Sequence, residues 1–304
     1  MLFKNLTVYR LPPHWSGSAA NLEEALGRRP LQACTPLQMR SLGWVGASPA
    51  QRLLHVVGEQ YLLALGIDQK LLPASVIRQQ AEERARQQAE SQGFPVGRRQ
   101  MRAVRMQVAD ELRARAFSRR TVTHAWIDRT NGRLVVDTGS AARAEELLAT
   151  LRDTLGSLPV EPLEVERSVS GCMAAWLGQG GPAGPFSLEQ DLELQSADSA
   201  KASIRYRRHP LEGSDIRGHL SSGKRPTHLG LTWKGRISFV LTEKLQFKRV
   251  QFLELGTEKA SEQEDIDPVE RFDGDFAVMT GELSELLGDL CRELDGQEQR
   301  AVVQ

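Results

Sequence analysis

The sequence predicts a soluble α+β protein with mixed sheets and a long helical arm. The first observation is the Asn131-Gly132 pair between two β-rich runs, which is the strongest short signal for a hairpin. The second is apolar residues at helical spacing over 140–155 and 276–294. The third is a pair of polar helical stretches, 74–90 and 98–115, separated by a Gly/Pro break. No apolar run approaches the ~20 residues that span a bilayer.

The N-terminal part of the chain predicts a strand, a short helix and a hairpin. Residues 2–11 alternate in part between apolar and polar side chains, which indicates a strand of the mature fold rather than a secretory signal. Apolar residues share one face of a helix over 21–29. The run 52–72 predicts a hairpin, because two apolar stretches flank the turn at 58–60.

The following stretch predicts the arm. Pro73 suits the first position of a helix, which then continues to about residue 90. Glycines and a proline within 93–97 end that helix, and a second helix follows over 98–115. Both helices are too polar to be buried on all sides, so we expect one side to face solvent or a bound molecule.

The rest of the chain predicts alternating strands and helices. The hairpin over 121–138 is followed by a helix that Ser140 caps. Four glycines and two prolines within 178–185 predict a flexible loop or a boundary. The other expected elements are helices over 169–177, 215–220 and 276–294, and strands over 202–206, 227–233, 236–241 and 247–253.

Charge is segregated along the chain although the formal net charge is zero. Residues 71–125 contain eleven arginines against five acids, and residues 201–251 contain twelve lysines or arginines against three acids. From residue 252 onward the balance reverses, with four basic residues against fifteen acidic. A neutral chain can therefore present a strongly positive surface, which suits a polyanion.

The basic residues form clusters that predict contacts with nucleic acid. Arginines and lysines on a rigid scaffold neutralise phosphates and release counterions. For any single cluster, a salt-bridged or solvated face is about as good an explanation, but several clusters in one chain favour nucleic acid. Because few aromatics are interleaved with the charges, we expect backbone contact with duplex rather than stacking on single strands. The candidate DNA-binding residues are Arg98, Arg99, Arg102, Arg115, Arg119, Arg205, Arg207, Arg208, Lys224 and Arg225.

The search for catalytic chemistry is mostly negative. The sequence has no phosphate-binding glycine loop, no GxSxG and no HExxH motif. Its histidines are scattered, and its three cysteines are too far apart for a CxxC, which favours reduced thiols in a cytosolic protein. We therefore expect no enzyme activity, no cofactor and no metal.

The acidic C-terminal stretch leaves an alternative open. Acids cluster over 262–267 and again at Asp273 and Asp275. Paired carboxylates could hold Mg²⁺ for phosphodiester cleavage, which would make the protein a metal-dependent nuclease. The preferred interpretation is a solvated acidic loop that pairs with a basic surface. A third interpretation is a scaffold that binds a charged protein partner, with DNA incidental.

Several short motifs identify a resemblance that covers essentially the whole chain. They occur in order from end to end, and none is a catalytic signature. The motifs are MLFKNL at 1–6, VYRL at 8–11, RAFSR at 115–119, WID at 126–128, NG at 131–132, LGSLPV at 155–160, RFDGDF at 271–276 and MTGEL at 279–283. The chain resembles the RdgC family of bacterial recombination-associated proteins.

The resemblance implies a function and an assembly. It implies a cytoplasmic, nucleoid-associated protein that binds DNA with little sequence preference, double strands more than single strands, and has no membrane partner. It further implies an α+β fold of its own topology, and a homodimeric ring with a basic hole that encircles duplex. By the same resemblance, the protein restrains strand exchange promoted by RecA.

The resemblance also assigns roles to individual residues. It places Phe117 at the contact that closes the ring, although the residues alone also allow an ordinary core anchor for the following hairpin. It directs Arg207, Arg208 and Lys224 into the hole. The chain departs from the family pattern over 87–101, where arginines replace a lysine-rich arm.

We expect three domains. The central α+β domain comprises 1–72 with part of 121–170 and 230–304. The helical arm comprises 73–120, and a smaller basic α+β domain comprises 171–230.

Overall fold

One antiparallel sheet runs through the described chain, and strand β1 (Asn5–Arg10) lies in its middle. The computed structural model describes residues 3–12, 15, 17–182, 184–196, 198, 202–211, 213–253 and 267–295. Strand β1 pairs with β6 (Arg133–Val136) on one side and β12 (Phe247–Phe252) on the other. The strand order is β2-β4-β5-β6-β1-β12-β11-β10-β8-β9, with β3 on β4 and β7 on β1.

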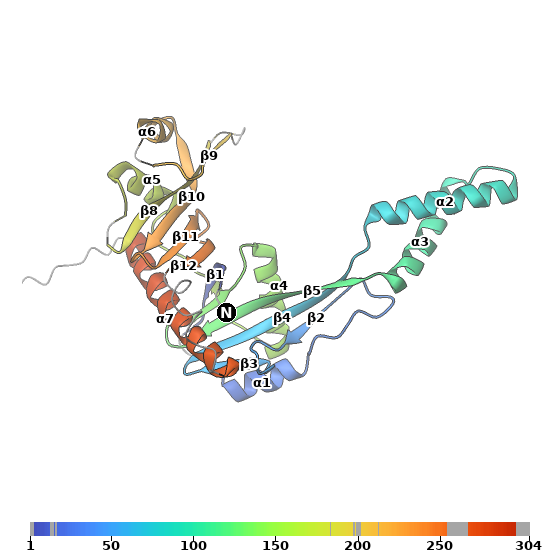
Figure 1. Cartoon of the computed structure of the whole chain (residues 1–304), viewed down its shortest axis with the longest axis horizontal. Coiled ribbons are helices and arrows are strands. Elements are labelled where there is room, and N and C mark those ends of the chain that lie inside the picture. Colours follow the sequence, from blue (N-terminus) through green and yellow to red (C-terminus); the bar gives the residue numbers. More distant parts are fainter. Residues whose placement is uncertain are drawn as a thin grey trace, which may run out of the picture.

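Around this sheet the described chain forms a crescent. The arm made by α2 and α3 forms one tip, and α6 with β9 forms the other (Figure 1). The remaining strands are β2 (Arg40–Val45), β3 (Leu54–Val57), β4 (Gln60–Lys70), β5 (Ser118–Asp128), β7 (Glu161–Pro162), β8 (Phe186–Ser196), β9 (Ser203–Tyr206), β10 (Lys224–Trp233) and β11 (Ile237–Thr242). The helices are α1 (Ala19–Gly27), α2 (Ala74–Gln92), α3 (Arg98–Arg115), α4 (Ala141–Leu155), α5 (Val169–Gln179), α6 (Ser214–Ser221) and α7 (Pro268–Asp295).

The α+β class is confirmed, whereas the expectation of mixed sheets is wrong for the named strands. Every pair of named strands in the described part of the chain is antiparallel. A parallel contact occurs between Pro30 and Trp44, as an isolated bridge outside the strand pairs. The physical reason is that short turns, such as Asn131-Gly132 between β5 and β6, join strands antiparallel, whereas parallel neighbours need long crossovers.

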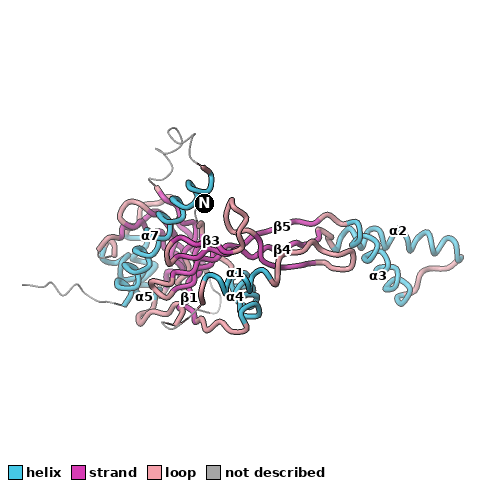
Figure 2. Tube along the Cα trace, turned by 90° about the horizontal axis from the view of Figure 1, so that it is seen from below, coloured by secondary structure: helices cyan, strands magenta, loops and turns pink. Residues whose placement is uncertain are grey.

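The β4–β5 pair is the longest ladder and connects the body to the arm. It runs without interruption from Gln60 opposite Asp128 to Lys70 opposite Ser118. In the body, both faces of this ribbon are covered: α1 and α4 bury leucines against one face, and α7 packs on the other. Towards the arm the ribbon leaves the body (Figures 1 and 2).

The arm is a hairpin of α2 and α3 with a very small core. Its buried residues are Ala81, Ala85, Val104 and Val108, and Ile77 and Leu112 pack against this core. Such a core cannot stabilise two helices by much, so an Arg84–Glu111 ion pair at 2.7 Å supports the contact between them. Both predicted arm helices are confirmed, including the bounds of the second.

At the other end of the crescent, strands β8 to β12 have one covered and one open face. Leucines and aromatics of β8, β10 and β11 pack against α5 and α7, and the tryptophan Trp233 is fully buried there. On the opposite face the side chains of β8 are acidic and partly exposed. This open face of β8, β9, β10 and β12 is called the β8 face.

Helix α7 joins the two halves of the sheet. Its buried residues recur at helical spacing from Phe276 to Leu294 and contribute to the larger core. The helix begins at Pro268, so the expected acidic loop at Asp273 and Asp275 is wrong: both residues lie inside the first turns of α7. The other predicted acids, 262–266, lie outside the described residues.

The fold predicts that stability falls in mild acid. His124 is half-buried on β5, and the burial of its imidazole lowers its pKa to about 4. Because an unfolded histidine titrates near ~6.5, the unfolded chain binds the proton more readily, so this stability is present above about pH 6.5 and is lost as pH falls towards 4. Burial lowers the pKa of His55 and His228 in the same direction.

We expect the free energy of unfolding to drop by about 1 kcal/mol between about pH 7 and about pH 5.5. Urea unfolding at the two pH values measures this difference. His124→Gln should make the dependence flatter, and an unchanged dependence in that variant would contradict the assignment.

Candidate nucleic-acid interface

The second arm helix carries a row of exposed arginines. Arg98, Arg102 and Arg105 are four and three residues apart, so they share one face of α3. Val104 and Val108 lie on another face, which packs against α2. The packing of the two helices therefore directs the arginine row away from the arm's own core.

The arm arginines fall into paired and unpaired groups. Arg84, Arg86 and Arg113 form ion pairs with acids of the same arm. Within the described residues, the predicted Arg98, Arg99, Arg102, Arg115 and Arg119, together with Arg105, form no ion pair. All six are exposed. Ion pairs within the arm therefore account for the first group alone, whereas the second group is solvated and available to an external anion.

Phe117 lies where α3 passes into β5, and its side chain is 85% exposed. The interpretation as a core anchor is therefore wrong. Its carbonyl accepts a hydrogen bond from the N–H of Leu71 at 2.7 Å, and Leu71 is itself 51% exposed. Next to them, Met39 accepts from the N–H of Lys70 and is partly exposed as well. The base of the arm thus presents apolar side chains to solvent, which is typical of an interaction surface.

A buried lysine fixes the arm to the ribbon. Lys70 is 7% exposed, and its Nζ donates to the carbonyl oxygens of Arg113 at 2.7 Å and Pro36 at 3.3 Å. The first of these carbonyls belongs to the last turn of α3, where a cation is favourable. Sequence reasoning missed this residue, because nothing near it in the chain shows that the two carbonyls converge on it.

The second group of predicted residues follows β9. Arg207 and Arg208 are exposed beyond the end of the strand and form no ion pair among the described residues. Arg205 differs, because its Nε donates to Glu193 Oε2 at 2.8 Å and its Nη2 bonds to the same oxygen. Its charge is thus already compensated in the isolated chain.

Lys224 and Arg225 begin β10 beside the N-terminus of α5. Lys224 is half-buried and donates to the hydroxyl of Ser222 at 3.2 Å, whereas Arg225 is exposed. Both residues line a shallow pocket together with Ser168, which caps α5, and Ser170. The structure therefore brings these two cations together with backbone N–H groups of a helix terminus, a setting that favours anions.

Asp273, one of the acids that the nuclease alternative requires, lies against β3. Asp273 lies 3.2 Å from Nε2 of buried His55, and the Phe272 and Phe276 rings contact the same imidazole edge-on. The RFDGDF motif thus attaches the start of α7 to β3. Among the described residues, no group of three histidine, cysteine or acidic side chains could hold a metal ion.

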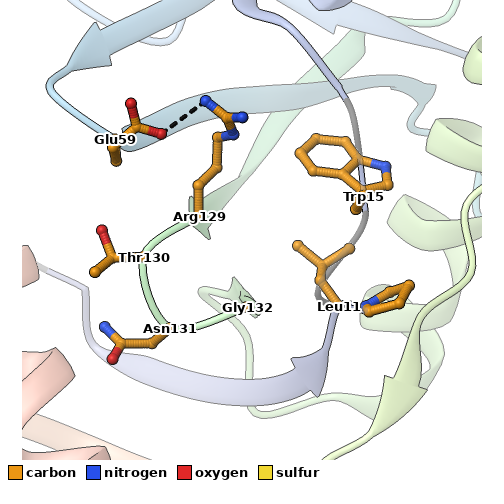
Figure 3. A pocket seen from close by; sticks show the side chains of 8 residues that line it. Leu11, Trp15, Glu59, Arg129, Thr130, Asn131 and Gly132 are labelled. Carbon is orange, nitrogen blue, oxygen red and sulfur yellow. Dashed lines mark hydrogen bonds and ion pairs between the residues drawn. The ribbon is translucent and has the colours of Figure 1, made fainter.

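A separate pocket lies at the Asn131-Gly132 turn. Figure 3 shows Arg129 bound to Glu59 on one side of the pocket and the Trp15 ring on the other. The Arg129 guanidinium also donates to Tyr61 Oη at 2.9 Å, so its charge and donors are used internally. Of the lining residues, the Glu59 carboxylate pairs with Arg129, and no hydrogen bond joins it to the Thr130 hydroxyl in the described structure, so the pocket supplies no argument for catalysis.

Comparisons with known proteins match almost the whole chain to the family that the motifs resemble. The family described as "RdgC: Putative exonuclease, RdgC" matches residues 1–297. A recombination-associated protein RdgC of Dechloromonas aromatica is 43% identical over 303 residues, covering 98% of both chains. One of Cupriavidus pinatubonensis is 44% identical over 298 residues, covering 98% of this chain and 99% of its own. One of Janthinobacterium sp. is 43% identical over 300 residues, covering 99% of this chain and all of its own.

The sheet, the arm and the two basic groups define an α+β protein that presents unpaired arginines at both ends of a crescent. The chain belongs to the RdgC family, whose curated members are named recombination-associated proteins. The resemblance inferred from the motifs is thereby confirmed. No helix within the described ranges has the length and apolar character needed to cross a membrane.

Proposed function

We propose that the protein binds duplex DNA with little regard to sequence, as a ring-shaped homodimer, and that it restrains recombination promoted by RecA. The observation that carries this proposal is the row of exposed α3 arginines that form no ion pair with the described residues. Guanidinium groups in such a row suit regularly spaced phosphates, and contacts with phosphates carry no sequence information. Single strands should bind more weakly, because few exposed aromatics accompany the arginines.

The crescent shape and the exposed Phe117 support the ring. Two crescents that meet at their ends enclose a space, and an exposed aromatic at the base of the arm supplies a contact for the second copy. In this arrangement Arg207, Arg208 and Lys224 line the hole with the arm arginines. The division into a central domain, an arm and a smaller basic domain is part of the same proposal.

Restraint of RecA then follows from occupancy of DNA. A protein that coats or encircles duplex blocks strand exchange without any covalent chemistry, which agrees with a non-enzymatic role without cofactor. We place the protein in the cytoplasm, on the nucleoid, where the DNA that it would bind lies.

Retention on closed DNA tests the ring directly. The protein is loaded on a closed circular duplex and on the same duplex after linearisation, and both are challenged with high salt. A ring should remain on the circle and slide off the linear form, because salt weakens phosphate contacts but does not open a closed dimer. Equal loss from both would contradict encirclement and leave an open electrostatic clamp.

The family description also names an exonuclease, so cleavage needs its own test. Linear duplex is incubated with the protein and Mg²⁺ or Mn²⁺. We expect no shortening, because no group of three histidine, cysteine or acidic side chains that could hold a metal ion is found in the described part of the chain. Cleavage that disappears in the Asp273→Asn, Asp275→Asn double variant would establish the nuclease instead.

A further inference from the structure

The β8 face carries three carboxylates on one strand within a basic region. Glu189, Asp191 and Glu193 all lie on β8. Gly230 on the neighbouring strand shows that the first two share a face, since a Cβ there would meet Glu189 Cβ at 2.9 Å and Asp191 Cβ at 3.3 Å. Glu193 lies opposite Arg205 in the β8–β9 ladder, which places both on one face of the sheet.

Two of these carboxylates hold arginines. Glu193 binds Arg205, and Asp191 Oδ2 accepts from Arg249 Nη2 at 2.6 Å. In both pairs the cation is the more exposed partner: side-chain exposure is 55% for Arg205 against 17% for Glu193, and 59% for Arg249 against 27% for Asp191. The guanidinium groups therefore face solvent, with the carboxylates beneath them.

Asp191 also contacts a second arginine through its backbone. Its Oδ1 accepts from the N–H of Arg208 at 3.3 Å. Arg208 and Arg249 both have positive φ, 50° and 55°, a conformation that costs energy in residues other than glycine. The two strained residues thus share one carboxylate, which holds them in place on this face.

We propose that Glu193 and Asp191 are built-in competitors of DNA phosphate, which keep Arg205 and Arg249 neutralised until a duplex displaces the carboxylates. The inference rests on the proposed function and adds Arg249 to the binding surface. It predicts that the β8 face contributes less to affinity than its number of arginines suggests, because a phosphate contact of Arg205 or Arg249 breaks an existing ion pair. Contacts of this kind exchange readily and suit a protein that moves along DNA.

Glu193→Gln tests the competition, and Glu189→Gln is the matched control. Glu189 lies on the same strand and bonds to the Thr232 hydroxyl rather than to an arginine, so its removal changes the net charge equally without freeing a cation. We expect Glu193→Gln to bind a random duplex about threefold tighter than the control at ~0.1 M salt, with a log K against log salt slope steeper by about 0.9. In an Arg205→Gln background the gain should vanish.

The outcomes separate this inference from the proposed function. Absence of salt-dependent duplex binding by the unchanged protein would overturn the proposed function. Normal binding with equal affinities in Glu193→Gln and Glu189→Gln, or a gain that persists without Arg205, would overturn the competition alone. If Glu193→Gln lowers the melting temperature, the second ion pair is tested instead, with Asp191→Asn in the unchanged protein and in an Arg249→Gln background. The asparagine Oδ1 can still accept the hydrogen bond from the Arg208 N–H, so this variant should keep the local backbone in place. Tighter binding that requires Arg249 supports the competition, and its absence overturns it.

Discussion

Replacing Arg98, Arg99 and Arg102 together with glutamine is expected to weaken duplex binding on the order of 100-fold at ~0.1 M salt. These arginines are exposed and form no ion pair with the described residues, so each is free to neutralise a phosphate. Losing three contacts should also make the salt slope shallower by roughly 2.7, at about 0.9 for each phosphate. The loss should be equal for duplexes of unrelated sequence. Fluorescence anisotropy over a salt series measures both quantities.

A matched triple variant separates location from net charge. Arg143, Arg152 and Arg271 are exposed arginines of α4 and α7, outside the arm, and form no ion pair with the described residues. Replacing these three with glutamine removes the same charge and should weaken binding far less. Equal losses in the two triple variants would show that only long-range attraction acts, and a loss confined to particular sequences would indicate base readout. Melting temperatures should stay unchanged in the arm triple, since no internal ion pair is broken.

Short sequence motifs and helix propensity predicted the elements that are stabilised by residues close together in the chain. The Asn131-Gly132 hairpin was predictable because the turn type demands those residues, and buried Asp128 completes it by accepting from Asn131 N at 3.1 Å. The arm helices were predictable because helical propensity decides where packing contributes little.

The missed elements depend on packing that lies far along the chain. Strand β2 was not predicted. It contains Gly43, where a Cβ would lie 2.5 Å from the Leu31 backbone nitrogen, so glycine is needed for close approach. Strand β8 is irregular around Glu189, where successive residues are exposed and the alternation is lost. At the start of α7, Phe272 and Phe276 contact His55, and this packing overrides the poor helix propensity of Gly274.

For the candidate site, the sequence predicted which basic residues gather on the surface but not which of them form ion pairs with acidic residues. The basic clusters are visible in the sequence, and their exposure agrees with the expectation. What the sequence could not show is that Arg205 meets Glu193 across a strand pair, or that Asp191 holds Arg249. Strand register sets both contacts, and register depends on the whole sheet. Arg249 was missed for this reason, although the excess of basic residues over 201–251 was a signal for it.

Phe117→Ser is expected to weaken self-association by about 2 kcal/mol or more, roughly 30-fold in the dimer dissociation constant. The side chain is 85% exposed, so the isolated chain gains little from it, and the melting temperature of the monomer should change little. Within a dimer the same ring would be covered, and removing it exposes partner atoms that it had shielded from water. Sedimentation equilibrium over a range of concentrations measures the change.

Phe94→Ser is the matched control, because Phe94 is 58% exposed but lies in the loop between α2 and α3, at the far end of the arm. If the base of the arm makes the contact, only Phe117→Ser should dissociate the dimer, and that variant should also lose its salt-resistant retention on circular duplex. Dissociation of the dimer in Phe94→Ser alone would show that the dimer contact lies at the far end of the arm instead. Dissociation in neither would contradict ring closure through the arm, because these are its two most accessible aromatic side chains among the described residues.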